Sequence, residues 1–159
     1  MKQSAKNVTL AAIIAAVYIS VTFIFAPISF GYIQLRVSEA LTVLPVFTPA
    51  AIPGLFVGCM LSNLLIGGLG WIDFVFGSLA TLIAAFLTYK LRKNTFVALI
   101  PPVVVNAVIV GTYLGYLIYP GRNYMMSILF TFIGQLLSCY GFGYPLSLLL
   151  KKTKNDIFR

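Results

Sequence analysis

The sequence predicts an all-α membrane protein with six transmembrane helices and with both termini in the cytoplasm. Three observations lead to this prediction. The mean hydropathy is +1.01, only 9% of the 159 residues are charged, and most basic residues stand beside apolar runs. Six helices of about 20 residues occupy about 120 positions. The remainder suffices for turns and tails, so residues 1–159 are expected to form a single integral membrane domain.

Six apolar segments follow one another along the chain, at residues 8–26, 36–47, 50–66, 71–89, 96–119 and 125–150. The first is long enough to cross a membrane and carries no convincing signal-peptide cleavage site, so we expect it to be retained. The second segment ends at Pro45 and Pro49, because proline interrupts helical hydrogen bonding. A glycine-rich turn at 67–70 precedes the fourth segment, and Pro120-Gly121 ends the fifth.

The basic residues define the expected topology. They form three clusters, Lys2/Lys6, Lys90/Arg92/Lys93 and Lys151/Lys152/Lys154. Cytoplasmic flanks of membrane helices are enriched in Lys and Arg, so all three clusters are placed in the cytoplasm. This placement requires two crossings within residues 36–66 and not one. Because the second segment is shorter than the hydrocarbon core, we expect it to be tilted, partly unwound or sheltered by its neighbours.

Several kinds of function are disfavoured by the composition. The sequence has no histidine and no Gly-x-x-x-x-Gly-Lys-Ser/Thr motif, which argues against His-based catalysis and against nucleotide hydrolysis by this chain. Cys59 and Cys139 lie in apolar segments without metal-ligand spacing, and we expect them to be buried packing residues. The sequence therefore predicts no enzyme, no metal and no cofactor. The net charge of +8 gathers at membrane flanks, which argues against nucleic-acid binding.

Glu39 is the residue that points most directly to a function. It is one of three acidic residues, and apolar sequence broken only by Asp73 follows it for almost fifty positions. A carboxylate at membrane depth costs a few kcal/mol, so it marks a functional site by default. The structural alternative is a salt bridge to Arg36, three residues earlier on the same helical face. The two interpretations are compatible with each other.

The predicted topology brings most polar residues of the apolar segments to the outer half of the bundle. The candidate substrate-binding residues are Gln34, Arg36, Glu39, Asn63, Trp71, Asp73, Asn106 and Gln135. Amides and carboxylates recognise hydrogen-bonding edges and an indole stacks on a flat ring, so the set suits a polar heterocycle. The alternatives are an interfacial position for Trp71 and hydrogen bonds between helices for the three amides Asn63, Asn106 and Gln135. Tyr113, Tyr116 and Tyr119 are further candidates for the wall of a pocket.

Small residues in the first segment form a second candidate site. Ala11, Ala12, Ala15 and Ala16 are spaced so that another helix can approach closely. This surface is predicted either to dock a partner membrane protein or to pack inside the same bundle, and the spacing alone does not separate the two.

The stretch Tyr32-Ile-Gln-Leu-Arg-Val-Ser-Glu-Ala-Leu-Thr-Val-Leu-Pro45 resembles the signature of the QueT family. The alanine-rich first segment, the Gly67-Gly68 turn before Trp71 and Asp73, and the overall length agree with it. QueT proteins resemble the substrate-binding S components of energy-coupling factor (ECF) transporters. The resemblance covers essentially the whole chain, and Gln-Leu-Arg-Val-Ser-Glu-Ala is its most specific part.

The resemblance implies a six-helix, S-component-like bundle in a bacterial plasma membrane, with an outward-facing pocket for a queuosine precursor. Such a precursor is a 7-deazaguanine base, for example 7-aminomethyl-7-deazaguanine. It also implies partners, namely a transmembrane coupling subunit and two cytoplasmic ATPases that use the ATP. In the family the Ala-x-x-x-Ala motif meets the coupling subunit, and the matching pairs here are Ala11 with Ala15 and Ala12 with Ala16.

These expectations suggest roles for the candidate residues. Glu39 and Asp73 would bind the amidine-like edge and the amine of the base, in an order that the sequence leaves open. Trp71 or a tyrosine would stack on the ring, and Asn63, Asn106 or Gln135 would bind its carbonyl and amine. The alternative function is a stand-alone secondary carrier in which Glu39 is the proton-coupling carboxylate.

Overall fold

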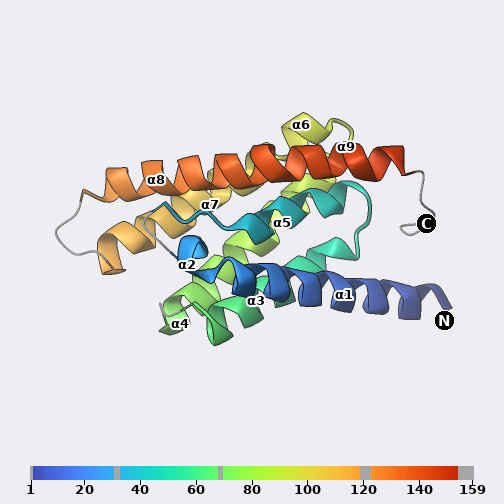
Figure 1. Cartoon of the computed structure of the whole chain (residues 1–159), viewed down its shortest axis with the longest axis horizontal. Coiled ribbons are helices and arrows are strands. Elements are labelled where there is room, and N and C mark those ends of the chain that lie inside the picture. Colours follow the sequence, from blue (N-terminus) through green and yellow to red (C-terminus); the bar gives the residue numbers. More distant parts are fainter. Residues whose placement is uncertain (1, 31–32, 68–69, 119–122, 154–159) are drawn as a thin grey trace.

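The computed structural model describes residues 2–30, 33–67, 70–118 and 123–153, and the regular secondary structure in these ranges is helical, with no β-strand. Figure 1 shows the helices running roughly along one long axis. The α-helices are α1 (Lys2–Ile24), α2 (Ala26–Ser29), α3 (Ala51–Leu65), α4 (Gly70–Ile72), α5 (Ser78–Lys90), α6 (Thr95–Ala98), α7 (Ile100–Tyr113), α8 (Tyr124–Leu136) and α9 (Tyr144–Lys152). One 3-10 helix, η1 (Val37–Val46), and three π-helical segments, η2 (Asp73–Gly77), η3 (Leu114–Ile118) and η4 (Leu137–Gly143), complete the described part.

Several of these elements follow one another without a break and form longer continuous helices, called rods below. In the described ranges, four helices are long and apolar enough to cross a membrane: Gln3–Ile24, Gly70–Lys90, Thr95–Leu117 and Tyr124–Lys152. Val37–Val46 and Ala51–Leu65 are shorter apolar helices. The predicted all-α membrane class is thus confirmed. Because the two short helices fall below the about 20 residues that span a bilayer, the count of six crossings stays a prediction.

The second segment has the shelter that its short length requires. Its core, η1, is a ten-residue 3-10 helix that contains Pro45, and seven of its residues are buried. Arg36 precedes η1 in an extended conformation, and its carbonyl accepts a hydrogen bond from the backbone N–H of Glu39 at 2.9 Å. Backbone groups without α-helical partners are tolerated at membrane depth only where protein surrounds them. The expectation of a short, sheltered segment is therefore confirmed.

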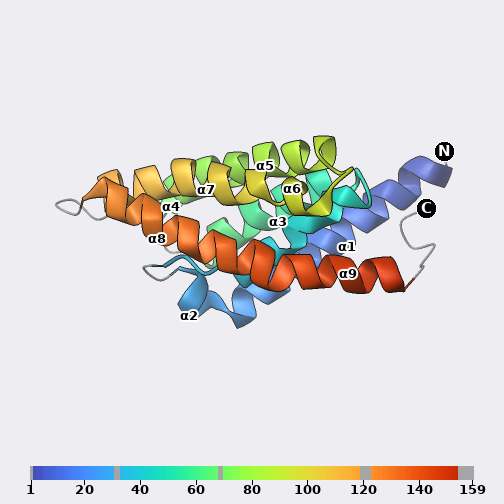
Figure 2. The ribbon, with the colours of Figure 1, turned by 90° about the horizontal axis from the view of Figure 1, so that it is seen from above.

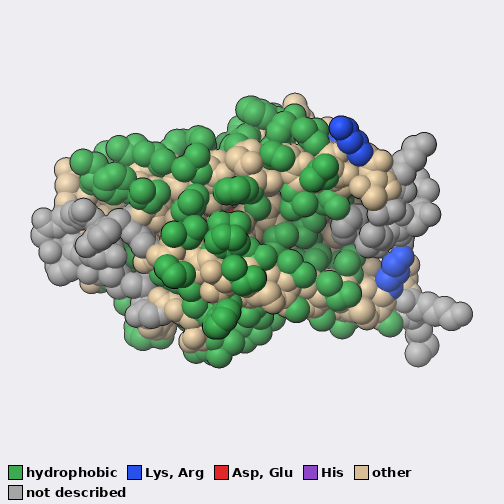
Figure 3. Space-filling model, viewed as in Figure 1, with side chains coloured by type: hydrophobic (Ala, Val, Ile, Leu, Met, Phe, Trp, Pro, Cys, Tyr) green, Lys and Arg blue, Asp and Glu red, His purple; other side chains and the backbone are tan. Residues whose placement is uncertain are grey.

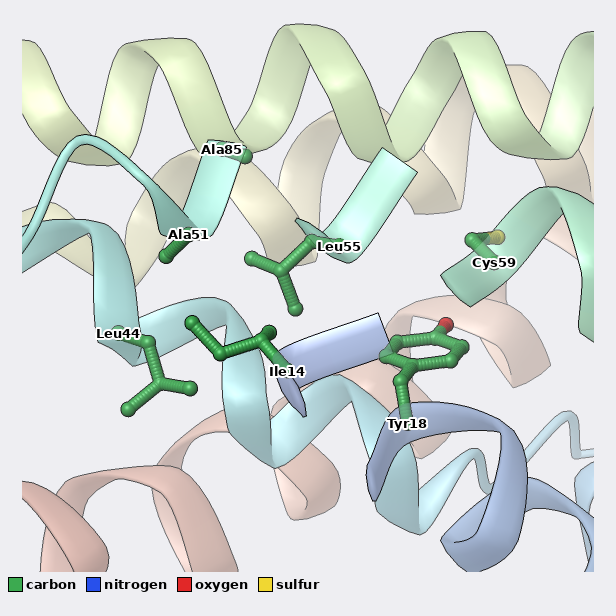
Figure 4. Packing of buried hydrophobic residues seen from close by; sticks show 7 residues of the cluster. All are labelled: Ile14, Tyr18, Leu44, Ala51, Leu55, Cys59 and Ala85. Carbon is green, nitrogen blue, oxygen red and sulfur yellow. The ribbon is translucent and has the colours of Figure 1, made fainter. Parts of the chain in front are cut away.

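Glycine and alanine determine how closely α1 approaches α3. A Cβ atom added at Gly54 would lie 2.7 Å from the carbonyl oxygen of Ala11, and one at Gly58 would lie 3.1 Å from the Cα of Ala15. Both distances are shorter than a normal van der Waals contact, so only glycine allows this approach. Figure 4 shows the adjoining core, in which α1, η1, α3 and α5 contribute the buried side chains Ile14, Tyr18, Leu44, Ala51, Leu55, Cys59 and Ala85.

The described residues of the three basic clusters lie at one end of the bundle. Figures 1 and 2 show the first turn of α1 and the last turn of α9 at the same end. The ammonium of Lys151 donates a hydrogen bond to the hydroxyl of Thr95 at 2.7 Å, which brings the segment after Lys90 to this end as well. In Figure 3 the visible Lys and Arg side chains gather there, while apolar side chains cover most of the rest of that face. If all three basic clusters face the cytoplasm, they must lie at the same end of the bundle, and this arrangement agrees with that requirement.

Some residues used in the sequence-based predictions fall outside the described ranges. They are Tyr32, Gly68, Tyr119, Pro120, Gly121 and Lys154.

Candidate functional site

Arg36 and Asp73 form an ion pair inside the bundle. The Nη2 atom of Arg36 lies 2.9 Å from Oδ2 of Asp73, and the two side chains are 5% and 0% exposed. Arg36 stands at the start of η1 and Asp73 is the first residue of η2. The structural alternative, a salt bridge between Arg36 and Glu39, is therefore not observed, and Arg36 pairs with Asp73 instead. Three positions along η1 separate their backbones, but the guanidinium is directed to another helix, where a buried carboxylate compensates its charge.

Glu39 is bound by neutral donors. The hydroxyl of Tyr18 in α1 donates to Oε1 at 2.5 Å, and the amide nitrogen of Asn106 in α7 donates to Oε2 at 3.2 Å. The residue is 1% exposed. In the part of the chain that the structure describes, the Arg36–Asp73 pair is the only salt bridge. Glu39 is therefore a buried carboxylate whose described hydrogen-bond donors are neutral and which forms no ion pair with a described residue.

Asp73 holds a second group of polar side chains. Besides the ion pair, its Oδ1 accepts a hydrogen bond from the hydroxyl of Tyr113, and its backbone carbonyl accepts one from Nδ2 of Asn63 at 2.9 Å. A Cβ atom added at Gly77 would lie 2.7 Å from Oδ1 of Asp73 and 2.9 Å from Nδ2 of Asn63. The absence of a side chain at Gly77 thus makes room for this cluster.

Both cysteines are buried, as predicted, but they pack among polar groups. The sulfur of Cys59 lies 3.8 Å from Nη1 of Arg36, 3.5 Å from Nδ2 of Asn63 and 3.3 Å from the hydroxyl of Thr81. The sulfur of Cys139 lies 3.9 Å from Oε1 of Gln135. Thiols are weak donors and acceptors, so these residues fill the space between stronger hydrogen-bonding groups.

Several buried polar atoms lack a hydrogen-bond partner among the described residues. They are both amide atoms of Gln34, Nε of Arg36, Oδ1 of Asn63 and the hydroxyls of Ser29, Ser62 and Ser138. An unpaired amide buried in an apolar medium costs about 1–3 kcal/mol judged from protein mutations. Four of these atoms belong to three predicted site residues, Gln34, Arg36 and Asn63. Each of these atoms would be stabilised by a further hydrogen-bond partner.

The structure joins most of the predicted substrate-binding residues. Hydrogen bonds and the ion pair group Arg36 with Asp73 and Asn63, and Glu39 with Asn106. Gln135 is buried and contacts Cys139. Gln34 is buried too, and its carbonyl oxygen would lie 2.9 Å from a Cβ atom added at Gly134, the neighbour of Gln135 in the chain.

Trp71 is the exception among the predicted residues. It is 71% exposed, in the three-residue helix α4. Its position agrees with the alternative of an interfacial aromatic residue. Tyr116 is exposed as well, whereas Tyr113 reaches Asp73. Sequence reasoning missed Tyr18, whose spacing of four residues from the core residue Ile14 would have indicated an inward-facing position.

The alanine stripe is divided between two faces of α1. Ala15 is buried and Ala11 half-buried, and both pack against the glycines of α3. Ala12 and Ala16 are exposed. For Ala11 and Ala15 these contacts support the alternative of packing inside the bundle. Ala12 and Ala16 present a small-residue surface to the outside.

The site suits hydrogen bonding and ion pairing rather than metal chemistry. Across the described ranges, no group of three or more His, Cys, Asp or Glu side chains is close enough together to hold a metal ion. What the site does offer is two carboxylates, one guanidinium, several amides and two tyrosine hydroxyls, gathered from η1, α1, α3, η2 and α7. Such a set can bind a polar ring with several donors and acceptors.

Comparison with known proteins agrees with this picture. A family model described as QueT transporter matches residues 8–152. A curated relative, the queuosine precursor transporter QueT of Lactococcus lactis subsp. cremoris (strain MG1363), is 37% identical over 84 residues, which are 52% of this chain and 48% of the relative. The matched region thus spans about half the length of that relative. No solved structure shows significant similarity. With a family match that covers nearly all of its length and four helices able to cross a bilayer, the chain is a multi-pass membrane protein that belongs to the QueT transporter family.

Proposed function

We propose that this chain is the substrate-capture (S) subunit of an ECF-type importer and that it binds a queuosine precursor at the outer side of the membrane. The expected ligand is a 7-deazaguanine base such as 7-aminomethyl-7-deazaguanine. Membership in the QueT transporter family and the name of the Lactococcus relative support the class of substrate. The fold supports the topology, because the basic residues gather at one end of the bundle, which we assign to the cytoplasm.

The observation that carries the proposal is the buried polar cluster around Arg36, Glu39 and Asp73. Charged and amide side chains in the middle of an apolar bundle cost free energy unless each is paired. Part of that cost is offset by hydrogen bonds within the protein, but atoms of Gln34, Arg36 and Asn63 have no described partner. A ligand with several donors and acceptors would complete these bonds.

The ion pair suggests which carboxylate binds the amine of the ligand. Asp73 is compensated by Arg36, whereas Glu39 has only neutral donors in the described structure. A cation brought to Glu39 would form a charge-assisted hydrogen bond, which is about twice as strong as a neutral one. We therefore assign the aminomethyl cation to Glu39. For stacking, Tyr113 fits better than Trp71, because Tyr113 is buried beside Asp73 and Trp71 is exposed.

Energy for uptake would come from partner proteins. The sequence contains no phosphate-binding motif of the Gly-x-x-x-x-Gly-Lys-Ser/Thr type. The proposed partners are a transmembrane coupling subunit and two cytoplasmic ATPases. The exposed pair Ala12 and Ala16 supplies a surface on which another helix can pack closely.

A binding screen tests the proposal. Purified protein in detergent would be titrated by calorimetry with guanine, 7-deazaguanine, 7-aminomethyl-7-deazaguanine, riboflavin and thiamine. We expect the aminomethyl base to bind with a Kd near 1 nM, about −12 kcal/mol, and the two vitamins to give no heat. Tighter binding of riboflavin or thiamine would refute the assigned substrate class.

Reconstitution separates the proposal from the carrier alternative. Proteoliposomes that contain this chain alone would be compared with proteoliposomes that also contain a coupling subunit and both ATPases. We expect uptake of the labelled base only in the complete system and only with internal ATP. Uptake by the chain alone that follows an imposed proton gradient would instead identify a secondary carrier with Glu39 as its coupling group.

A further inference from the structure

Among the described residues, Gln34 is the one whose side chain leaves the most buried polar atoms without a hydrogen-bond partner. Its side chain is buried, and neither Nε2 nor Oε1 has a hydrogen-bond partner among the described residues. Arg36 and Asn63 each leave one atom unpaired, but both also make hydrogen bonds. Gln34 leaves a donor and an acceptor unpaired side by side. Buried groups of this kind in a native protein require an explanation.

The backbone at Gln34 is held in an unusual conformation. Its φ angle is +54°, and Gln34 is the only non-glycine residue with positive φ in the described ranges. The left-handed region is unfavourable for residues with a Cβ atom. Two contacts keep the segment there: the carbonyl of Gln34 accepts a hydrogen bond from the N–H of Arg36 at 2.9 Å, and the peptide of Ile33 and Gln34 lies directly against Gly134 in α8.

These two observations are independent of each other and point to the same conclusion. A strained backbone conformation persists only where the contacts around it hold it in place, and residues in such conformations concentrate at ligand sites. A carboxamide with both atoms free pairs best with a flat group that presents an N–H donor next to an acceptor, because two parallel hydrogen bonds then form at once.

We infer that Gln34 is the specificity-determining residue of the proposed base-binding site, and that its carboxamide forms a two-bond pair with a donor–acceptor edge of the ring. This inference rests on the proposed function. A 7-deazaguanine base has three such edges: N1–H beside the C6 carbonyl (the lactam edge), the 2-amino group beside N3, and N9–H beside N3. Recognition of either of the first two selects guanine-like rings, and recognition of the third selects free bases over nucleosides.

The test is a cycle that combines one protein change with two ligand changes. Gln34→Met keeps the length of the side chain and removes both hydrogen-bonding atoms. The ligands are 7-aminomethyl-7-deazaguanine, its 6-deoxo analogue, which lacks the lactam, and its 3-deaza analogue, which lacks N3. Calorimetry gives six dissociation constants. Gln3→Met, the same replacement at an exposed position of α1, serves as the matched control.

We expect one of the two analogues to bind wild-type protein at least about 30-fold more weakly than the parent base, a ratio equivalent to about 2 kcal/mol. In Gln34→Met that ratio should fall below about 3-fold, whereas Gln3→Met should keep it. A loss with the 6-deoxo analogue identifies the lactam edge, and a loss with the 3-deaza analogue identifies the side of the ring that contains N3. Thermal unfolding of ligand-free Gln34→Met should occur at or above the wild-type temperature, because the change removes two unpaired buried atoms.

Two results would overturn the inference in different ways. If Gln34→Met binds the parent base and discriminates against the analogues as strongly as the wild type does, Gln34 contacts none of these edges, and the proposed function stands. If wild-type protein binds none of the three bases while remaining folded, the proposed function fails, and the role of Gln34 fails with it.

Discussion

Arg36 and Asp73, 37 positions apart in the chain, meet at 2.9 Å inside the bundle and connect η1 to the rod of α4, η2 and α5. Removal of one partner from a buried pair leaves an uncompensated charge, which costs about 3–5 kcal/mol. We expect Arg36→Met and Asp73→Asn each to lower the free energy of unfolding by this amount. Denaturant titration in mixed micelles measures it.

The double variant Arg36→Met/Asp73→Asn is the control for that experiment. It removes both charges and keeps an acceptor for the hydroxyl of Tyr113. We expect it to be more stable than either single variant, because no buried charge is left alone. Additive losses in the double variant would mean that the two side chains act independently, against the observed geometry.

Glu39 is expected to dominate ligand affinity. Glu39→Gln keeps the size of the side chain and removes its charge, so it should weaken binding of 7-aminomethyl-7-deazaguanine at least about 100-fold, or about 2.7 kcal/mol. Tyr18→Phe removes only the hydroxyl that donates to Oε1. It should cost about tenfold or less, as one hydrogen bond does. Calorimetry checks both, and unchanged affinity in Glu39→Gln would make this carboxylate a structural acceptor for Tyr18 and Asn106.

Gly77 gives a test of the shape of the site. In Gly77→Ala the new methyl group would lie within 3 Å of Asp73 and Asn63 side-chain atoms, so both side chains must shift. We expect a loss of stability of about 1–3 kcal/mol, as in other overpacked sites, and a loss of ligand affinity. Gly141→Ala is the matched control, because a Cβ atom there meets nothing within 4 Å. Equal effects of the two changes on ligand affinity would argue against a site beside Gly77.

The two faces of α1 lead to a prediction about assembly. Ala12→Leu enlarges an exposed residue and should leave the fold and ligand binding intact, while co-purification with the proposed coupling subunit falls at least tenfold. Ala15 lies on the buried face of α1 and packs against Gly58, so Ala15→Leu should instead prevent stable folding. Val104→Leu, at an exposed position of α7, controls for added bulk. Normal assembly of Ala12→Leu would remove this face from the proposed interface.

The extents of the helices could be predicted because hydropathy is a local property. The segment expected at 71–89 is observed at 70–90, with α4, η2 and α5 in one rod. The sheltered second segment followed from its length and from Pro45. By contrast, the π-helical geometry of η2 has no composition signal, since its residues Asp-Phe-Val-Phe-Gly resemble the rest of the apolar run.

The membership of the site was partly predictable and its pairing was not. Polar residues in apolar segments identified Glu39, Asp73 and Asn106, because burial of such groups requires partners. The partner of Arg36 was missed, since it depends on how η1 packs against η2 rather than on spacing within η1. Tyr18 was missed because a tyrosine in an apolar helix looks like any other aromatic residue, and its hydroxyl acquires a role only next to Glu39.

The π-helical segment η2 begins at Asp73 and ends at Gly77, so the wide turn lies within the polar cluster itself. A π-bulge accommodates one residue more than the α-helical turns that flank it. Each residue of an α-helix turns the chain by about 100°. In a regular α-helix, one additional residue would therefore rotate α4 about a quarter of the way around the axis relative to α5. The wide turn takes up this residue instead, so the extra length is confined to the stretch where Asp73 pairs with Arg36.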